Sequence, residues 1–207
     1  YKVQILENQF TGLLLKINNQ ELWVKLIGNF NAYNLLAIYA TADLLGLEQL
    51  EVLQLMSTLE SVEGRFQYLV SEKNITAIVD YAHTPDALKN VLETINSIRT
   101  GNEELITVVG CGGDRDIQKR PKMGSIAARL SSKVIFTSNN PRSENPNEII
   151  EQIEAGVPPE HYKKTVSIAE RKQAIKTACK FSETGDILLI AGKGHENYQE
   201  INGERFH

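Results

Sequence analysis

Regular alternation of short apolar runs with longer amphipathic segments is the feature that most constrains the fold of this chain. From residue 66 onward, runs such as LITVVG (105–110) and DILLIAG (186–192) are typical of buried strands. They alternate with segments of helical periodicity about 10 to 15 residues long, as in sheets built by right-handed crossovers. The sequence therefore predicts an α/β fold with a mostly parallel sheet in this part of the chain.

The first third of the chain has a different pattern. Residues 1–27 contain three short runs rich in branched apolar residues, which predict strands, and residues 31–47 and 48–59 show helical spacing. Gly46 is a natural stop for the first of these helices. The segment SVEGRFQ (61–67) has the character of a connector. We therefore expect one α/β domain or part of a domain over 1–64 and a second over 65–207.

Composition excludes several classes of protein. The net charge of −4 gives no general attraction to nucleic acid or to an anionic membrane. No apolar run approaches the roughly 18 residues that a membrane-spanning helix needs. The two cysteines make no disulfide framework, and the four histidines show no metal-ligand spacing. We expect a cytoplasmic, monomeric protein that binds small molecules, with Cys111 as a small buried residue.

Both ends of the sequence look like cuts through a longer protein. The chain begins with YKVQILENQF, which has no methionine and enters strand-like alternation at once. It stops at INGERFH, directly after another strand-like stretch. We therefore expect part of the functional machinery to lie outside these 207 residues.

Four loops that follow predicted strands carry the unusual polar residues. They are VDYAHTPDA (79–87), GCGGDRDIQKRP (110–121), TSNNPRSENP (137–146) and AGKGHENYQ (191–199). Ligands of parallel sheets bind at the carboxyl ends of the strands, so we expect these loops to form one site. Its polar side chains would be Asp80, His83, Asp114, Arg115, Lys119, Arg120, Asn140, Arg142, Lys193, His195 and Glu196. This cationic set favours an anionic ligand, and Arg115 and Arg142 suit two-pronged binding of a carboxylate.

Each loop also has a structural interpretation. Lys193 between two glycines resembles a phosphate loop, but neither G-x-x-x-x-G-K-[ST] nor G-x-G-x-x-G is present. GCGGDRD is also explained as a solvated glycine-rich turn, and NNPRSENP as a loop rich in turn-forming residues. His83 and Thr84 could serve only to cap the following helix, in which Pro85 takes the first turn.

Six motifs occur in the order found in the Mur ligases of peptidoglycan synthesis, and the chain resembles that family from about residue 28 to 201. They are GNFNAYN, EGRF, VDYAHTPDAL, GCGGDRD with KRPKMG, TSNNPRSENP and GKGHENYQ. The resemblance is strongest to the branch that adds the third residue of the stem peptide. It implies the tail of a central ATPase domain over 1–64 and a Rossmann-like C-terminal domain over 65–207.

The resemblance also implies an activity. Mur ligases use ATP and Mg²⁺ to join a carboxylate to an amine through an acyl phosphate, here meso-diaminopimelate to UDP-N-acetylmuramoyl-L-alanyl-D-glutamate. The family's Gly-Lys-Thr loop, its magnesium ligands and its carbamylated lysine are all missing from this sequence. We therefore expect no catalytic residue and no metal ligand within the chain, and no ATP hydrolysis by the chain alone.

Functional residues can be transferred by motif. The resemblance implies substrate-binding roles for Arg115, Asn140, Pro141, Arg142, Ser143, Gly192 and Glu196. It implies nucleotide-binding roles for Asn31, Asn34, Arg65, Asp80 and His83. In this interpretation Arg115 and Arg142 bind the distal carboxylate of diaminopimelate, Glu196 and the Gly192 carbonyl bind the distal ammonium, and Lys193 binds no ligand.

Arg142 favours diaminopimelate over lysine, because lysine has no distal carboxylate and its ammonium would be repelled. Asn139 stands where the family usually has aspartate, and we expect this loss of charge to loosen the loop's own hydrogen bonding.

A lysine-adding homologue and a non-catalytic amino-acid-binding module remain alternatives. Folylpolyglutamate and cyanophycin synthetases are disfavoured by NNPRSE and GKGHENYQ. A dehydrogenase-like domain is disfavoured by the lack of a dinucleotide fingerprint.

Overall fold

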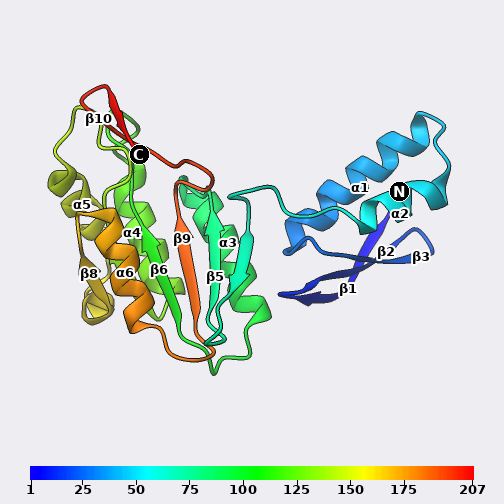
Figure 1. Cartoon of the computed structure of the whole chain (residues 1–207), viewed down its shortest axis with the longest axis horizontal. Helices are drawn as coiled ribbons and strands as arrows, with labels where there is room; N and C mark the ends of the chain where they lie inside the picture. The colour runs from blue at the N-terminus through cyan, green and yellow to red at the C-terminus, as the bar shows by residue number, and fades with distance from the viewer. The chain divides into compact units, whose positions relative to one another are not determined.

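The computed structural model describes residues 1–207, and the chain divides into two compact units, residues 1–62 and residues 63–207 (Figure 1). The division falls within the segment expected to be a connector, two residues before the boundary inferred from the sequence. None of the helices is both long enough and apolar enough to span a membrane.

Unit 1 is a three-stranded antiparallel sheet with two helices. The strands β1 (Val3–Gln9), β2 (Gly12–Ile17) and β3 (Gln20–Val24) form a meander in sequence order. The helices α1 (Asn29–Leu44) and α2 (Gln49–Ser57) pack on this sheet. The apolar residues of β2 alternate inward and join buried side chains of both helices in one core. Gly46 follows α1 with a left-handed φ of +79°, as expected for a helix stop.

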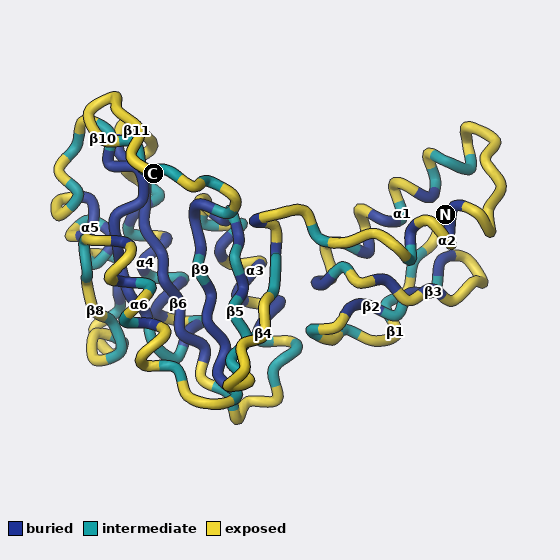
Figure 2. Tube along the Cα trace, in the orientation of Figure 1, coloured by how far each residue is buried: buried dark blue, intermediate teal, exposed yellow.

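Unit 2 is built on a six-stranded sheet in the order β4-β5-β9-β6-β7-β8. The strands are β4 (Gln67–Val70), β5 (Thr76–Asp80), β6 (Leu105–Val109), β7 (Lys133–Phe136), β8 (Thr165–Ser167) and β9 (Ile187–Ala191). Every neighbouring pair is parallel except β4 and β5, which are antiparallel. The mostly parallel sheet expected from the sequence is therefore confirmed. The central strands β6 and β9 are buried almost throughout (Figure 2).

Helices cover the sheet of unit 2. They are α3 (Pro85–Ile98), α4 (Lys119–Leu130), α5 (Pro146–Glu154) and α6 (Arg171–Phe181), with a 3₁₀ helix over Pro159–Lys164. Helix α4 packs against α3 and α5, whereas α6 packs on the face of the sheet that carries Ile106, Val108 and Leu188. Thr84 caps α3 by accepting a hydrogen bond from the Ala87 amide, and Pro85 is its first residue.

A short hairpin of β10 (Gln199–Ile201) and β11 (Glu204–Phe206) ends the chain. Its first strand pairs with the loop after β7 through an isolated bridge between Arg142 and Ile201. The two cysteines differ in environment: Cys111 is buried and Cys179 is exposed. Burial raises the pKa of the Cys111 thiol to about 11, so the expected small buried residue is confirmed.

Candidate functional site

The four polar loops meet at one edge of the sheet. Strand β9 lies between β5 and β6 and parallel to both, so the loop after β9 (191–199) lies between the loops after β5 and β6. The loop after β7 follows on the far side of β6. Together they enclose a cavity of about 500 Å³. It is lined by Tyr81, His83, Thr84, Pro85, Gly112, Arg115, Asp116, Lys119, Lys122, Asn139, Asn140, Arg142, Gly192 and Glu196.

Most of the residues with predicted substrate roles share this cavity: Arg115, Asn140, Arg142, Gly192 and Glu196. Pro141 and Ser143 do not line it. The Pro141 carbonyl accepts a hydrogen bond from the Glu144 amide, and the Ser143 hydroxyl donates to the Asp114 carboxylate at 2.7 Å. These two residues therefore shape the loop after β7, and a direct contact of either with substrate stays a prediction.

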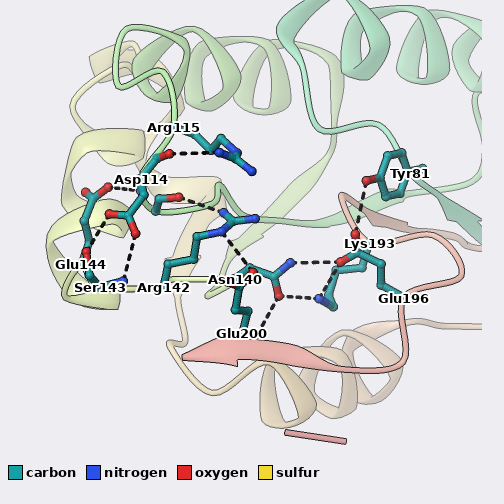
Figure 3. A network of polar contacts seen from close by, with 11 residues as sticks. Tyr81, Asp114, Arg115, Asn140, Arg142, Ser143, Glu144, Lys193, Glu196 and Glu200 are labelled. Carbon is teal, nitrogen blue, oxygen red and sulfur yellow. Dashed lines mark hydrogen bonds and ion pairs between the residues drawn. The ribbon is translucent and has the colours of Figure 1, made fainter. Parts of the chain in front are cut away.

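Arg142 is held on several sides. Its backbone lies in the left-handed region at φ +51°, its amide donates to the Glu200 carbonyl, and its carbonyl accepts from the Asn202 amide. In its guanidinium, Nη1 donates to the Gly113 carbonyl at 2.8 Å and Nε pairs with Glu200 at 3.1 Å (Figure 3). Nη2 makes no hydrogen bond within the chain, so it is the donor available to a ligand carboxylate.

Arg115 makes fewer contacts within the chain than Arg142 does. Its side chain is exposed, and its one hydrogen bond is a long contact of 3.4 Å to the carbonyl of its neighbour Asp114. It lies two residues after Gly113 and lines the same cavity as Arg142. A well-anchored arginine and an exposed one can together bind a carboxylate that enters from solvent.

Glu196 is the anionic group of the cavity. Its Oε2 accepts from Asn140 Nδ2 and from Lys193 Nζ, each at 3.0 Å, and its Oε1 accepts from the Tyr81 hydroxyl at 3.2 Å (Figure 3). Burial alone would raise the pKa of Glu196, but the hydrogen bonds from these three donors outweigh burial and hold the pKa below its usual range. Glu196 is therefore ionised near neutral pH and can attract an ammonium group.

Lys193 is a site residue whose role the sequence did not reveal. It is buried, and its ammonium bridges Asn140 Oδ1 at 2.8 Å and Glu196 Oε2 at 3.0 Å. Burial lowers the pKa of Lys193, although the hydrogen bond to Glu196 opposes that shift. Lys193 therefore holds two predicted ligand-binding side chains in place. The spacing of a lysine three residues before a glutamate was the only sign of this pair in the sequence.

Asn139 forms a hydrogen bond that an aspartate at this position would not make. Its Nδ2 donates to the Gly192 carbonyl at 3.1 Å, and its Oδ1 is buried without a hydrogen-bond partner. A carboxylate has no N–H to donate to this carbonyl. At this position the amide ties the loop after β7 to the loop after β9, which does not fit the expectation of looser hydrogen bonding.

A buried ion pair fastens the two loops that carry the arginines. Arg120, which is fully buried, donates from Nη1 and Nη2 to the two carboxylate oxygens of Glu144 at 2.8 Å, and also to the Gly112 carbonyl at 3.2 Å. Glu144 accepts in addition from the Asp114 amide. The Arg120 guanidinium lowers the pKa of Glu144 to about 2. The expectation that Arg120 faces the ligand was wrong, because its side chain is directed into this ion pair.

The residues with predicted nucleotide roles in unit 2 lie next to the cavity. His83 lines it, and the Arg65 guanidinium lies 4.5 Å from the centre of the Tyr81 ring. Asp80 is buried, and its two oxygens accept from the amides of Phe66 and Ala82 at 2.7 Å each. Burial raises the pKa of Asp80, although these backbone hydrogen bonds oppose the shift. Asp80 thus ties the connector to the end of β5.

Asn31 and Asn34 lie one turn apart on α1 of unit 1. Asn34 Nδ2 donates to Asn31 Oδ1 at 3.1 Å, and Asn31 Nδ2 donates to the Ile27 carbonyl at 2.7 Å. The two amides therefore form a small hydrogen-bonded pair at the start of the helix. No group of three or more His, Cys, Asp and Glu side chains in the chain is arranged to hold a metal ion.

A parallel sheet with a polar cavity at its carboxyl edge defines an α/β ligand-binding domain, and the cavity's opposite charges suit an amino acid. The sequence profile described as "Mur ligase, glutamate ligase domain" matches residues 64–194. The chain belongs to this family.

Curated relatives support the same assignment over the whole chain. The UDP-N-acetylmuramoyl-L-alanyl-D-glutamate–2,6-diaminopimelate ligase of Bacteroides thetaiotaomicron is 55% identical over 207 residues, which is 100% of this chain and 43% of that protein. The ligase of the same name from Cytophaga hutchinsonii is 53% identical over 206 residues and is covered to 42% of its length. The chain thus spans less than half the length of these relatives.

Solved structures agree with the fold. A structure of a UDP-N-acetylmuramoyl-L-alanyl-D-glutamate–2,6-diaminopimelate ligase is similar to 98% of this chain, with a TM-score of 0.68 and 38% identity, over 42% of its own chain. A folylpolyglutamate synthase from Thermotoga maritima has a TM-score of 0.70 over 92% of this chain and 43% of its own. Its identity is only 18%, so this second likeness concerns the fold alone.

Proposed function

We propose that this chain is the amino-acid-binding part of an ATP-dependent ligase that adds meso-diaminopimelate to UDP-N-acetylmuramoyl-L-alanyl-D-glutamate. The observation that carries this proposal is the charge arrangement of the cavity. It presents the free Nη2 of Arg142 and the exposed Arg115 for a carboxylate, and the ionised Glu196 with the Gly192 carbonyl for an ammonium. One end of diaminopimelate carries both of these groups on a single carbon.

Binding the distal end of diaminopimelate would leave its other amine free to react. The residues of this chain then act by orientation, because they fix the distal carboxylate and ammonium and so aim the reacting amine. ATP would supply the phosphoryl group that activates the carboxylate of the acceptor as an acyl phosphate. Arg65, Asp80 and His83, with Asn31 and Asn34, are the proposed nucleotide contacts of this chain, and Mg²⁺ would be held mainly by residues outside it.

Arg142 is the proposed determinant of substrate choice. A bound lysine would leave Nη2 of Arg142 without a carboxylate partner in a site built for one. Hydrogen bonds that involve a charged group contribute about 1.5–3 kcal/mol, which corresponds to roughly a 10- to 150-fold preference for diaminopimelate. We propose a cytoplasmic enzyme that acts as a monomer on these small-molecule substrates.

Calorimetric titration tests the proposal. We expect diaminopimelate to bind the full-length enzyme at least about tenfold more tightly than lysine does. Arg142→Ala should lose most of this preference, whereas the exposed Arg129→Ala on α4 is the matched control and should keep it. Equal affinity of the unmodified enzyme for lysine and diaminopimelate would contradict the proposed specificity. Tight amino-acid binding without any ligation would favour a non-catalytic binding module.

A further inference from the structure

Tyr81 lines the cavity and has no part in the proposed function. It follows β5 directly. The Arg65 guanidinium lies 4.5 Å from the centre of its ring, and two histidine rings also contact it, with centroid distances of 4.7 Å to His83 and 5.8 Å to His195. Its hydroxyl reaches Oε1 of Glu196 at 3.2 Å (Figure 3). The packing of the ring fixes the place of the hydroxyl.

The two oxygens of Glu196 differ in how many donors they already have. Oε2 accepts from both Asn140 and Lys193, whereas Oε1 accepts only from Tyr81. An ammonium that enters the cavity therefore finds acceptor capacity mainly at Oε1, beside the Tyr81 hydroxyl. Burial raises the pKa of Tyr81, and the nearby Glu196 raises it further, so the hydroxyl stays protonated and donates a hydrogen bond to the carboxylate.

A phenol that donates one hydrogen bond still has lone pairs with which to accept others. The Gly192 carbonyl is in a similar position, because it accepts one hydrogen bond from Asn139 and has a second lone pair. Tyr81, Gly192 and Glu196 all line the same cavity. The cavity wall thus offers three oxygens of different kinds, and an ammonium group has three N–H donors.

We propose that the Tyr81 hydroxyl is a third acceptor for the distal ammonium of the amino-acid substrate, beside Glu196 Oε1 and the Gly192 carbonyl. This inference rests on the proposed function, since it takes diaminopimelate as the substrate. It makes Tyr81 a specificity residue for the amine end, as Arg142 is for the carboxylate end. A phenylalanine would satisfy the ring contacts with Arg65 and the histidines equally well, so only the hydroxyl needs this explanation.

Steady-state kinetics of the full-length enzyme with Tyr81→Phe test the inference. We expect the KM for diaminopimelate to rise about tenfold, because a hydrogen bond to a charged group is lost, while the KM for ATP stays the same. The inhibition constant of 2-aminopimelate, which has both carboxylates but no distal amine, should not change. Tyr162→Phe replaces an exposed tyrosine far along the chain, and as the matched control it should leave all three constants unaltered.

Comparison of the two ligands separates the possible outcomes. A folding defect or a shift of the loops would weaken diaminopimelate and 2-aminopimelate equally, and that result would overturn the role of the hydroxyl. An unchanged KM for diaminopimelate in Tyr81→Phe would overturn it as well. Failure of the unmodified enzyme to ligate diaminopimelate would instead reject the proposed function.

Discussion

Arg120 and Glu144 form a two-pronged ion pair beside the candidate site. Arg120 is completely buried and donates to both oxygens of Glu144, which is partly exposed. Removing one partner of a buried ion pair costs about 3–5 kcal/mol, because the remaining charge is left without compensation. We therefore expect Glu144→Ala to lower the free energy of unfolding by about that amount in urea titrations. Glu148→Ala, at an exposed position on α5, is the control and should change it by less than about 0.5 kcal/mol.

The same pair makes stability depend on pH in acid. The pKa of Glu144 is about 2 in the folded protein, against an ordinary value of 4.5. A carboxyl group with a depressed pKa contributes stability above its unfolded-state pKa, and this contribution is lost as the pH falls through the folded-state value. The unfolding free energy should therefore decline between about pH 4.5 and pH 2, with a smaller slope in Glu144→Ala. Parallel curves for the two proteins would contradict this assignment.

Individual residues also show which features of the site could be predicted from the sequence and which could not. Arg115, Arg142 and Glu196 could be placed at one site because each follows a strand of a parallel sheet, and the strand ends meet. The contact of Lys193 with Asn140 and that of Arg120 with Glu144 could not be predicted. Asn140 is 53 residues from Lys193, and Glu144 is 24 residues from Arg120, so these pairs exist only after the loops have been brought together.

Helices α4 and α5 approach closely at Gly124. Helix propensity and steric crowding have opposite effects on stability at this position. Alanine is better than glycine in a helix interior by about 1 kcal/mol, so propensity alone predicts that Gly124→Ala stabilises the protein. A Cβ at this position would lie only 2.0 Å from the Ile153 carbonyl oxygen at the end of α5. Because that contact is with backbone, the helices must move apart. We expect a net loss of about 1–3 kcal/mol in the unfolding free energy.

Thermal and urea unfolding of Gly124→Ala measure this balance directly. Arg129→Ala lies on the exposed side of the same helix, and it should change stability by less than about 0.5 kcal/mol. A stabilised Gly124→Ala protein would show that α5 adjusts freely, and the close approach of the two helices would then not be a constraint on the fold.

At the level of whole elements, the apolar pattern of the sequence identified nearly every strand and helix, because the helices bury one stripe and the central strands β6 and β9 are continuous apolar runs. The order of the strands in the sheet could not be predicted from this pattern. The last strand of the sheet, β9, lies between β5 and β6, and β4 runs against its neighbour. Both facts depend on which strands pair over long sequence distances, and local patterns carry no information about such pairing.

The insertion of β9 has a consequence for the molecule as a whole. It places the loop with Glu196 at the centre of the carboxyl edge of the sheet, between the loop with Tyr81 and the loop with Arg115. A single cavity can therefore combine groups from the second, third and fourth quarters of the chain. In the proposed ligase this geometry would select the amino acid, and we expect the chemistry of ATP to require residues outside this chain.

The chain by itself should therefore not hydrolyse ATP. Phosphoryl transfer in such ligases needs a phosphate-binding loop and bound magnesium, and the sequence contains no G-x-x-x-x-G-K-[ST] motif. We expect no ADP release above background from the 207-residue chain with ATP and Mg²⁺, in a coupled assay that readily detects ADP from the full-length enzyme at equal concentration. Magnesium-dependent ADP release by the chain alone would mean that its own residues assemble a nucleotide-hydrolysing centre, and the division of labour proposed here would be wrong.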